Sequence, residues 1–405
     1  MHDTPLISTI ALGFAWALVL GLFASKVRLS PIVGYLLAGI VIGPYSPGFV
    51  GDAEIAAELA EVGVMLLMFG VGLHFSPKDL WDVKGVALPG AIGQIIVATA
   101  MGAALTHWWG YSLAEGLVFG LALSVASTVV LLKALETRHR MNTRNGRIAI
   151  GWLVVEDLVM VVVLVLLPVV ATILGVKPVD GEAAPTDAAS TAVTLALTLG
   201  KVALFVLLML TVVTRLFHWL MEVADRTGSR ELFTLTAVAL ALGTAYGAAY
   251  LFGVSFALGA FFAGVVVNSS DKSHRAAADL QPLQDVFTVL FFVGVGMLFD
   301  PTILFEEPLR VAAVVAVIVL GKSLVAVLIV RLLGGTRGAA IEVAAALAQI
   351  GEFSFILGAL GKSLGMLSDH GYSLILAGAL LSIVLNPFVF AYAGRVIRRA
   401  ELVAT

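Results

Sequence analysis

The amino-acid sequence predicts an all-α protein that crosses a membrane many times. Of its 405 residues, 60% are hydrophobic and only 13% are charged, and the mean hydropathy is +1.04. A chain of this composition cannot cover its apolar surface in water and needs a bilayer around it. Long apolar runs also occur along the whole chain, which predicts a polytopic membrane protein.

Composition excludes several classes of function. The chain has no cysteine, which removes a disulfide framework or a thiolate metal site, and its net charge of -3 gives no reason to expect a nucleic-acid partner. It contains no HExxH stretch or clustered carboxylates of the kind that bind a transition metal. We therefore expect no cofactor and no nucleic acid.

Thirteen apolar runs are bounded by charges or by Gly/Pro clusters. They lie near 6–24, 31–43, 59–75, 86–107, 113–134, 147–174, 191–217, 232–250, 254–268, 282–299, 309–333, 340–361 and 371–394. Two of them, 31–43 and 254–268, are shorter than the roughly 20 residues that cross hydrocarbon, so we expect them to extend into their flanks or to lie among other helices.

The basic residues predict the orientation of these spans. If alternate loops share a side, 19 of the 24 Lys and Arg residues fall together and only three, Lys177, Arg310 and Lys362, fall opposite. Positive charge concentrates on the cytoplasmic side of a membrane. The N-terminus is therefore predicted outside and the C-terminus in the cytoplasm. The remaining two, Lys201 and Lys322, lie inside apolar runs.

The chain repeats itself along its length. Residues 30–42 match 255–267 in their glycine spacing, and GVGLHFSP at 70–77 matches GVGMLFDP at 294–301, with offsets of 225 and 224. We interpret 1–174 as a first repeat, 175–228 as a linker helix with loops, and 229–396 as a second repeat. A shift of seven helices inverts the second copy in the membrane, an arrangement typical of secondary transporters whose site lies between the halves.

The same offset pairs two polar stretches in the middle of apolar spans. Ser124–Thr128 of the fifth span corresponds to Ala348–Glu352 of the twelfth. Both are weak helix formers, so two broken helices could expose carbonyls and helix ends to an ion there. In the alternative, Ser127 and Thr128 only bond back to preceding carbonyls and Gly351 only allows close packing.

Two adjacent carboxylates, Glu156 and Asp157, lie inside the apolar stretch GWLVVEDLVM. Asp157 is about ten residues into its span, roughly 15 Å deep, where an unpaired charge costs on the order of 3 kcal/mol. Neighbouring side chains point about 100° apart on a helix, so we expect Asp157 to face the ion pathway and Glu156 to face a partner. Lys322, at similar depth in the other repeat, is the available counter-charge; a purely structural cluster is the alternative. Lys201 is expected to reach toward lipid headgroups.

Five motifs carry a family resemblance. They are LSPIVGYLLAGIVIGP at 29–44, LLMFGVGLHFSPKDL at 66–80, VEDLVMV at 155–161, FFVGVGMLFDP at 291–301 and QIGEFSFIL at 349–357. Together they resemble the membrane domain of the monovalent cation:proton antiporters, most closely the Kef-type and YbaL-like branch. The resemblance implies an NhaA-like fold of thirteen helices in a bacterial inner membrane. It also implies a homodimer whose core domain moves like an elevator.

The resemblance also implies roles for individual residues. Asp157 would carry the ion and the proton, Lys322 would match the family's intramembrane lysine, and Glu352 would be the carboxylate of the second broken helix. Where relatives carry Asp-Asp, Asn-Asp or Gln-Asp, this chain has Glu156-Asp157. Kef-type relatives usually continue into a cytosolic nucleotide-binding domain. This chain has no GxGxxG stretch, so we expect no such domain within it. The protein is either a short member of the family or lacks a cytosolic regulatory domain that relatives carry.

These features predict a transporter, not an enzyme. A proton and a dehydrated Na⁺ or K⁺ would compete for Asp157 and Glu156, supported by Lys322, Ser127, Thr128, Gln349, Gly351 and Glu352. A sodium-coupled solute symporter on the same fold remains an alternative, although few polar groups could bind an organic substrate. A ligand-gated K⁺ efflux channel would need a continuous polar lining, and the sequence offers one compact cluster. An intramembrane hydrolase would need a nucleophile paired with a base, which the sequence does not suggest.

Overall fold

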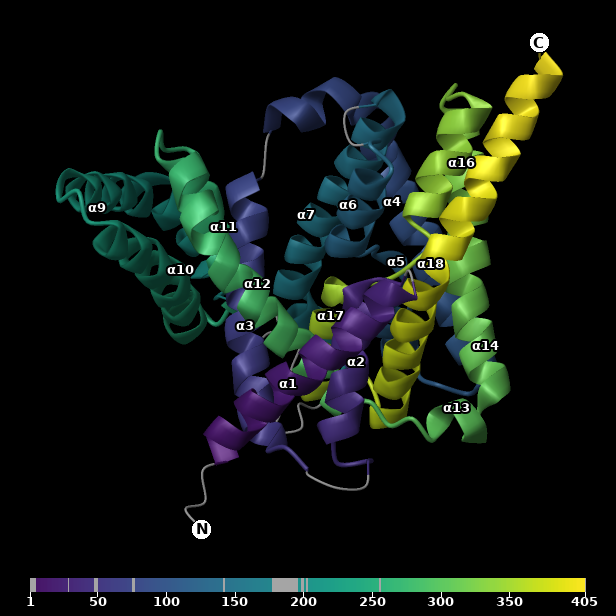
Figure 1. The fold of residues 1–405 in the computed structure, drawn as a ribbon, viewed down its shortest axis with the longest axis horizontal. Helices are drawn as coiled ribbons and strands as arrows, with labels where there is room; N and C mark the ends of the chain where they lie inside the picture. Colours follow the sequence, from purple (N-terminus) through teal and green to yellow (C-terminus); the bar gives the residue numbers. More distant parts are fainter. Residues whose placement is uncertain are drawn as a thin grey trace. The chain divides into compact units, whose positions relative to one another are not determined.

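The computed structural model describes residues 5–27, 29–46, 50–74, 77–140, 143–176, 196–197, 200–201, 203–254 and 256–404. In these ranges all regular secondary structure is helical (Figure 1). Among the described helices, nine are long and apolar enough to cross a membrane, and the shorter apolar helices include Pro31–Ile42, Leu113–Ser124 and Phe256–Asn268. The all-helical, multi-pass fold class is thus confirmed. A total of thirteen membrane helices stays a prediction.

The chain forms two compact units, and each draws on both halves of the sequence. Unit 1 comprises Met1–Ala24, Gly34–Phe75 and Pro185–Leu298, and unit 2 comprises Ser25–Val33, Ser76–Ala184 and Phe299–Thr405. The predicted repeats, 1–174 and 229–396, therefore do not fold as separate bodies. Each unit combines a part of one with a part of the other.

Unit 1 is a bundle of helices that pack through small residues. Its elements are α1 (Pro5–Lys26), α2 (Pro31–Ile42), α3 (Ala53–His74), η1 (Met209–Val213), α9 (Thr214–Arg226), α10 (Arg230–Phe252), α11 (Phe256–Asn268) and α12 (Ser273–Met297). Helix α3 packs against both α11 and α12, and α10 packs against α11. The buried face of α1 consists of Thr9, Gly13, Ala17, Gly21 and Ala24. Such a row of small residues lets helix backbones approach closely in a membrane.

Two glycine contacts within unit 1 mirror each other. A Cβ added at Gly39 of α2 would lie 2.0 Å from the Val293 carbonyl oxygen and 2.7 Å from Gly296 Cα on α12. A Cβ added at Gly72 of α3 would lie 2.3 Å from the Phe261 carbonyl oxygen and 2.9 Å from Gly264 Cα on α11. In the predicted repeat, Gly39 corresponds to Gly264 and Gly72 to Gly296. Under that prediction each contact is the other with the two copies exchanged.

Unit 2 contains the longest of the described helices. Its elements are α4 (Pro77–Trp108), α5 (Leu113–Ser124), α6 (Thr128–Thr137), α7 (Arg144–Ile173), α13 (Ile303–Glu306), α14 (Pro308–Ala316), η2 (Val317–Gly321), α15 (Lys322–Leu332), α16 (Arg337–Ala346), α17 (Glu352–Ser363) and α18 (Asp369–Ala404). Helix α4 packs against α5, α7 and α15. Hydroxyl caps start three of these helices, because the side chains of Ser112, Thr143 and Thr336 accept hydrogen bonds from backbone N–H groups in the first turn.

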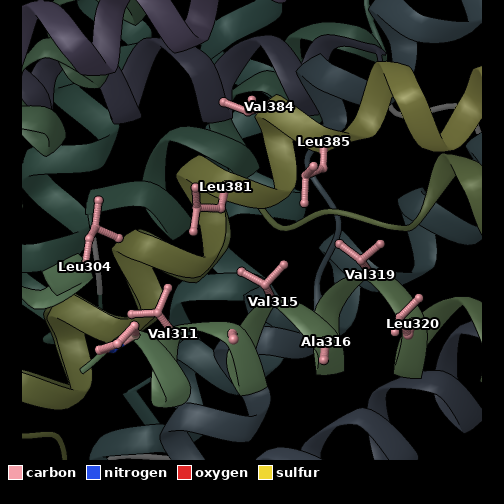
Figure 2. Close-up of a pocket in the computed structure, with 11 residues that line it drawn as sticks. Leu304, Val311, Val315, Ala316, Val319, Leu320, Leu381, Val384 and Leu385 are labelled. Atoms are coloured by element: carbon pink, nitrogen blue, oxygen red, sulfur yellow. The ribbon is translucent and has the colours of Figure 1, made fainter. Parts of the chain in front are cut away.

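An apolar groove of about 660 Å³ lies on unit 2 beside α14, η2 and α18 (Figure 2). It is lined by Leu304, Pro308, Val311, Ala312, Val315, Ala316, Val319, Leu320, Leu381, Val384 and Leu385. None of these lining side chains carries a polar group. The groove therefore offers nothing that would recognise a hydrophilic solute.

Candidate functional site

Two interruptions of helical structure cross in the interior of unit 2. The first separates α5 from α6 at 125–127, where Val125 is extended with φ -96° and ψ 132°. The second separates α16 from α17 at 347–351. A Cβ added at Gly351 would lie 2.2 Å from Ser127 Cβ, so the two interrupted segments touch. The predicted repeat offset of 224 maps Ser127 onto Gly351, so this contact joins two positions that the predicted repeat pairs.

Polar side chains satisfy the backbone groups that these interruptions leave free. The Gln349 amide accepts from the Ser127 N–H at 2.9 Å and donates to the Ser127 carbonyl at 3.1 Å. Asn386 of α18 donates to the Ala345 carbonyl at 3.2 Å, and the Ser382 hydroxyl accepts from the Ile350 N–H at 3.4 Å. A buried backbone group without a partner costs free energy comparable to a lost hydrogen bond. These side chains therefore make two non-helical segments possible in an apolar interior.

Asp157 and Glu352 each present one bonded and one unbonded carboxylate oxygen. Their side chains are 3% and 1% exposed. The Thr128 hydroxyl donates to Asp157 Oδ2 at 3.0 Å, and the Ser127 hydroxyl donates to Glu352 Oε2 at 2.8 Å. Within the described part of the chain, Asp157 Oδ1 and Glu352 Oε1 have no hydrogen-bond partner. The two hydroxyls are adjacent in sequence, so they join both carboxylates in one polar centre.

Glu156 is held differently from its neighbour. It is fully buried and accepts three hydrogen bonds: from Gln94 Nε2 at 2.8 Å, from Trp152 Nε1 at 3.2 Å and from the Ala126 N–H at 2.9 Å. Both carboxylate oxygens are thereby occupied. The bond to Ala126 ties α7 to the first interruption. As expected from their angular separation on α7, Glu156 and Asp157 have different partners.

Lys322 is fully buried, and its ammonium group donates to the Gln349 carbonyl at 3.1 Å. Among the described residues it forms no direct ion pair with a carboxylate. Electrostatic attraction nevertheless links it to Glu156. Lys322 therefore supplies a positive charge that interacts with Glu156.

A π-helical turn sets the direction of Lys322. From Val314 onward, the side chains buried on α14–η2–α15 recur every four residues, at Val314, Ile318, Lys322, Ala326 and Val330. At about 100° per residue, such a series would drift by about 160° around a regular helix. The wider turn η2 takes up one extra residue and removes about 100° of that drift. Lys322 therefore shares the buried face of the apolar residues before and after it.

Comparison with known proteins decides the family of this chain. The model of the transmembrane sodium/hydrogen exchanger family matches residues 14–393. The chain belongs to this family. YbaL of Escherichia coli K12, which is named provisionally as a cation/proton antiporter, is 57% identical over 400 residues. That alignment covers 99% of this chain and 70% of YbaL. The predicted resemblance to the cation:proton antiporters of the Kef and YbaL type is confirmed.

A plant relative and a solved archaeal structure are also similar to this chain. The K(+) efflux antiporter 4 of Arabidopsis thaliana is 34% identical over 362 residues, which cover 89% of this chain and 59% of the plant protein. The sodium proton antiporter MjNhaP1 of Methanocaldococcus jannaschii at pH 8 has a similar fold, with a TM-score of 0.68 at 14% identity. That superposition covers 96% of this chain and 97% of the other. The similarity therefore extends across almost the whole exchanger fold.

All eight residues proposed from the sequence gather in unit 2. Asp157, Glu156, Lys322, Ser127, Thr128, Gln349, Gly351 and Glu352 are linked to one another through the hydrogen bonds, charges and close contact described above. Ser127 and Thr128 donate to carboxylates, so the alternative of bonding back to preceding carbonyls does not describe their hydroxyls. Lys201 is exposed in unit 1, and its reach toward lipid headgroups stays a prediction.

Sequence reasoning missed Gln94 and Trp152. Gln94 was detectable as a lone glutamine in the apolar run 86–107, where polar side chains carry a cost. Trp152 precedes Glu156 by four residues, a spacing that places both on one face of α7. Neither the lone glutamine nor the four-residue spacing predicts the hydrogen-bond partner of the side chain.

Proposed function

We propose that this exchanger binds a monovalent cation, K⁺ or Na⁺, in competition with protons at Asp157 and Glu352. One observation carries the proposal: two buried carboxylates at the crossing of two interrupted helices each keep one oxygen free of hydrogen bonds. Carboxylate oxygens suit hard cations, and interrupted helices add backbone carbonyls and helix ends. Thr128 and Ser127 hold the other oxygen of each carboxylate and so fix its direction.

Charge balance explains why exchange would be coupled. If Lys322 and Glu156 offset each other, Asp157 and Glu352 remain as the charges that need a partner. A bare charge at the middle of the bilayer costs on the order of 3 kcal/mol on insertion scales. Protons or a cation would remove that cost, whereas the empty charged centre would be expensive to expose to the apolar barrier. The centre therefore crosses when occupied, and cation and proton movements remain linked.

We further propose an elevator-type alternation in which unit 2 carries this centre as one body. The compact packing of unit 2 supports this, because the centre lies inside it and every contact described above is internal to it. The mirrored glycine contacts in unit 1 and the Ser127–Gly351 contact in unit 2 support two inverted repeats. Nine of the described helices are long enough to cross the membrane, including Ala203–Arg226 before α10. Together with the short helices α2 and α11 and the interrupted pairs α5–α6 and α16–α17, each pair counted as one span, they account for the thirteen predicted spans.

Other features of the proposal rest on the comparisons and on the charge pattern. The names of the plant and archaeal relatives refer to K⁺ and to sodium, so both cations are candidates here. We propose a homodimer in a bacterial inner membrane with the N-terminus outside. A reporter fused after residue 404 that is active only in the cytoplasm tests the orientation. Activity of that reporter on the outer side would contradict it.

The decisive experiment uses purified protein in proteoliposomes with an imposed pH gradient. Addition of K⁺ or Na⁺ should release protons, as followed by a pH-sensitive dye, and Asp157→Asn should abolish the response. The matched control is Asp271→Asn, which changes an exposed aspartate between α11 and α12 and should leave exchange intact. Undiminished exchange by Asp157→Asn would remove the proposal. Single-channel currents would favour the channel, and cation uptake that moves a solute without protons would favour the symporter.

A further inference from the structure

We propose that Gln94 and Trp152 are positioning residues that keep Glu156 as a permanent carboxylate. In this role Glu156 is the fixed counter-charge of Lys322 and carries neither the cation nor the proton. The inference rests on the proposed function, which it deepens by dividing the three buried acids into one fixed charge and two exchangeable ones. Neither Gln94 nor Trp152 touches the exchangeable carboxylates through any hydrogen bond found in the described residues.

The chemistry of the three groups around Glu156 carries the first step. An indole N–H and a backbone N–H can only donate, and the Gln94 amide approaches Glu156 through its nitrogen. A protonated Glu156 would itself be a donor, and none of these three groups, as they are oriented, offers it an acceptor. The surroundings of Glu156 therefore favour the ionised carboxylate.

The orientation of the Gln94 amide supports the same state. Its oxygen, Oε1, is buried and has no hydrogen-bond partner among the described residues. Turning the amide by 180° would aim that oxygen at Glu156, where only a protonated carboxyl could bond to it. The amide instead leaves Oε1 unpaired while it donates to Glu156, so the carboxylate determines its direction.

Comparison with the two other buried acids carries the second step. Asp157 is bonded through one hydroxyl, that of Thr128, and a hydroxyl can donate or accept. Glu352 accepts from the Ser127 hydroxyl, and the Thr128 hydroxyl and the backbone N–H groups of Thr128 and Glu352 also interact with its carboxylate. Each also has an oxygen without a partner. The unpartnered oxygens of Asp157 and Glu352 leave room for a proton or a cation, whereas both oxygens of Glu156 are occupied by donating groups. The division between fixed and exchangeable acids follows from this difference.

The test moves the charge from one side of the Gln94–Glu156 pair to the other. Glu156→Gln should lower exchange by at least about tenfold, because Lys322 loses its counter-charge. The double variant Q94E/E156Q restores one carboxylate and one amide with their places exchanged. It should recover exchange to within about threefold of the wild type and restore the wild-type pH profile, because a fixed charge is needed near Lys322 but no transported ion is needed at position 156.

A second variant keeps the proposal testable if the double variant fails to fold, as judged by gel filtration and thermal melting in detergent. Trp152→Phe keeps a large ring but removes one donor that favours the ionised form. In a plot of exchange rate against pH, the decline on the acid side should then shift to higher pH by about half a pH unit or more, because Glu156 becomes easier to protonate. A purely structural contact would change stability and leave that decline in place.

The outcomes separate this inference from the proposed function. If the wild type exchanges, Asp157→Asn does not, and the folded double variant stays as low as Glu156→Gln, then Glu156 is itself a carrier and the inference fails. An unshifted pH profile for folded, active Trp152→Phe overturns it as well. Absence of exchange by the wild type, or normal exchange by Asp157→Asn, overturns the proposed function instead.

Discussion

Gly351 packs directly against Ser127 where the two helix interruptions of unit 2 cross, and a Cβ at Gly351 would lie 2.6 Å from Ser127 Cα. Gly351→Ala should therefore push the two segments apart. We expect a loss of about 1–3 kcal/mol in stability, the usual cost of overpacking, together with at least tenfold slower exchange. Thermal melting in detergent and proton flux in proteoliposomes measure the two effects.

Gly338 provides the matched control for this change. It lies in α16 of the same unit, and a Cβ added there would meet nothing within 4 Å. Gly338→Ala should leave both melting temperature and exchange close to those of the wild type. A Gly351→Ala protein that behaves like this control would show that the close contact is not needed.

Glu352→Gln should weaken cation binding and change the ratio of protons to cations. The substitution removes one of the two exchangeable negative charges, so we expect the half-saturating cation concentration to rise by at least about tenfold. The control is Glu342→Gln, because Glu342 is also buried in unit 2 but Asn145 and Arg140 contact its two oxygens. Cation titrations at fixed pH and charge-movement measurements under a clamped voltage provide the readout. An unchanged affinity and ratio would confine the exchange site to Asp157.

Thr128→Val should raise the half-saturating cation concentration by about three- to thirtyfold while preserving the fold. Valine keeps the branched shape but removes the hydroxyl that directs Asp157 Oδ2. Thr236→Val is the comparison, since the Thr236 hydroxyl only donates to the Leu232 carbonyl on the exposed side of α10. The proposal predicts altered affinity for the first variant and wild-type affinity for the second. Equal titration curves for both would mean that Thr128 has no part in the site.

Gly39→Ala and Gly264→Ala should destabilise unit 1 to a similar extent. Each added methyl group would meet a carbonyl oxygen, that of Val293 or of Phe69, at 2.0 or 2.1 Å. We expect about 1–3 kcal/mol for each, with cation affinity unchanged because the site lies in unit 2. Gly243→Ala on α10, where nothing lies within 4 Å, should be neutral or slightly stabilising. Very different losses for the first two variants would argue against a two-fold relation between the repeats.

Much of the fold was predictable because membrane helices obey local rules. The expected span 86–107 lies within α4, which begins earlier at Pro77, and 232–250 lies within α10. Hydrophobic length is a property of adjacent residues, so composition alone locates these spans. The same locality explains what was missed. Hydrophobicity along 309–333 does not reveal the π-helical turn at 317–321, because the extra residue is as apolar as its neighbours.

The candidate site was predictable in its members but not in its connections. Charged side chains in hydrocarbon are costly, so Glu156, Asp157, Lys322 and Glu352 stand out from any apolar background. Gln94 did not stand out in the same way, because its importance comes from a bond to Glu156, 62 residues away. Periodicity carries no information about such a distance. Only folding brings α4, α7 and the interruption at Ala126 to one carboxylate.

The sequence by itself determined the solvent, the spans and the identity of the buried charges, because each follows from side-chain chemistry and short-range spacing. The tertiary structure alone decided how those charges differ. Three donors surround Glu156, whereas Asp157 and Glu352 each keep one oxygen free. The reason is physical: a carboxylate's protonation and its availability to a cation depend on the donors that surround it in space. Those donors come from helices that are distant in the chain.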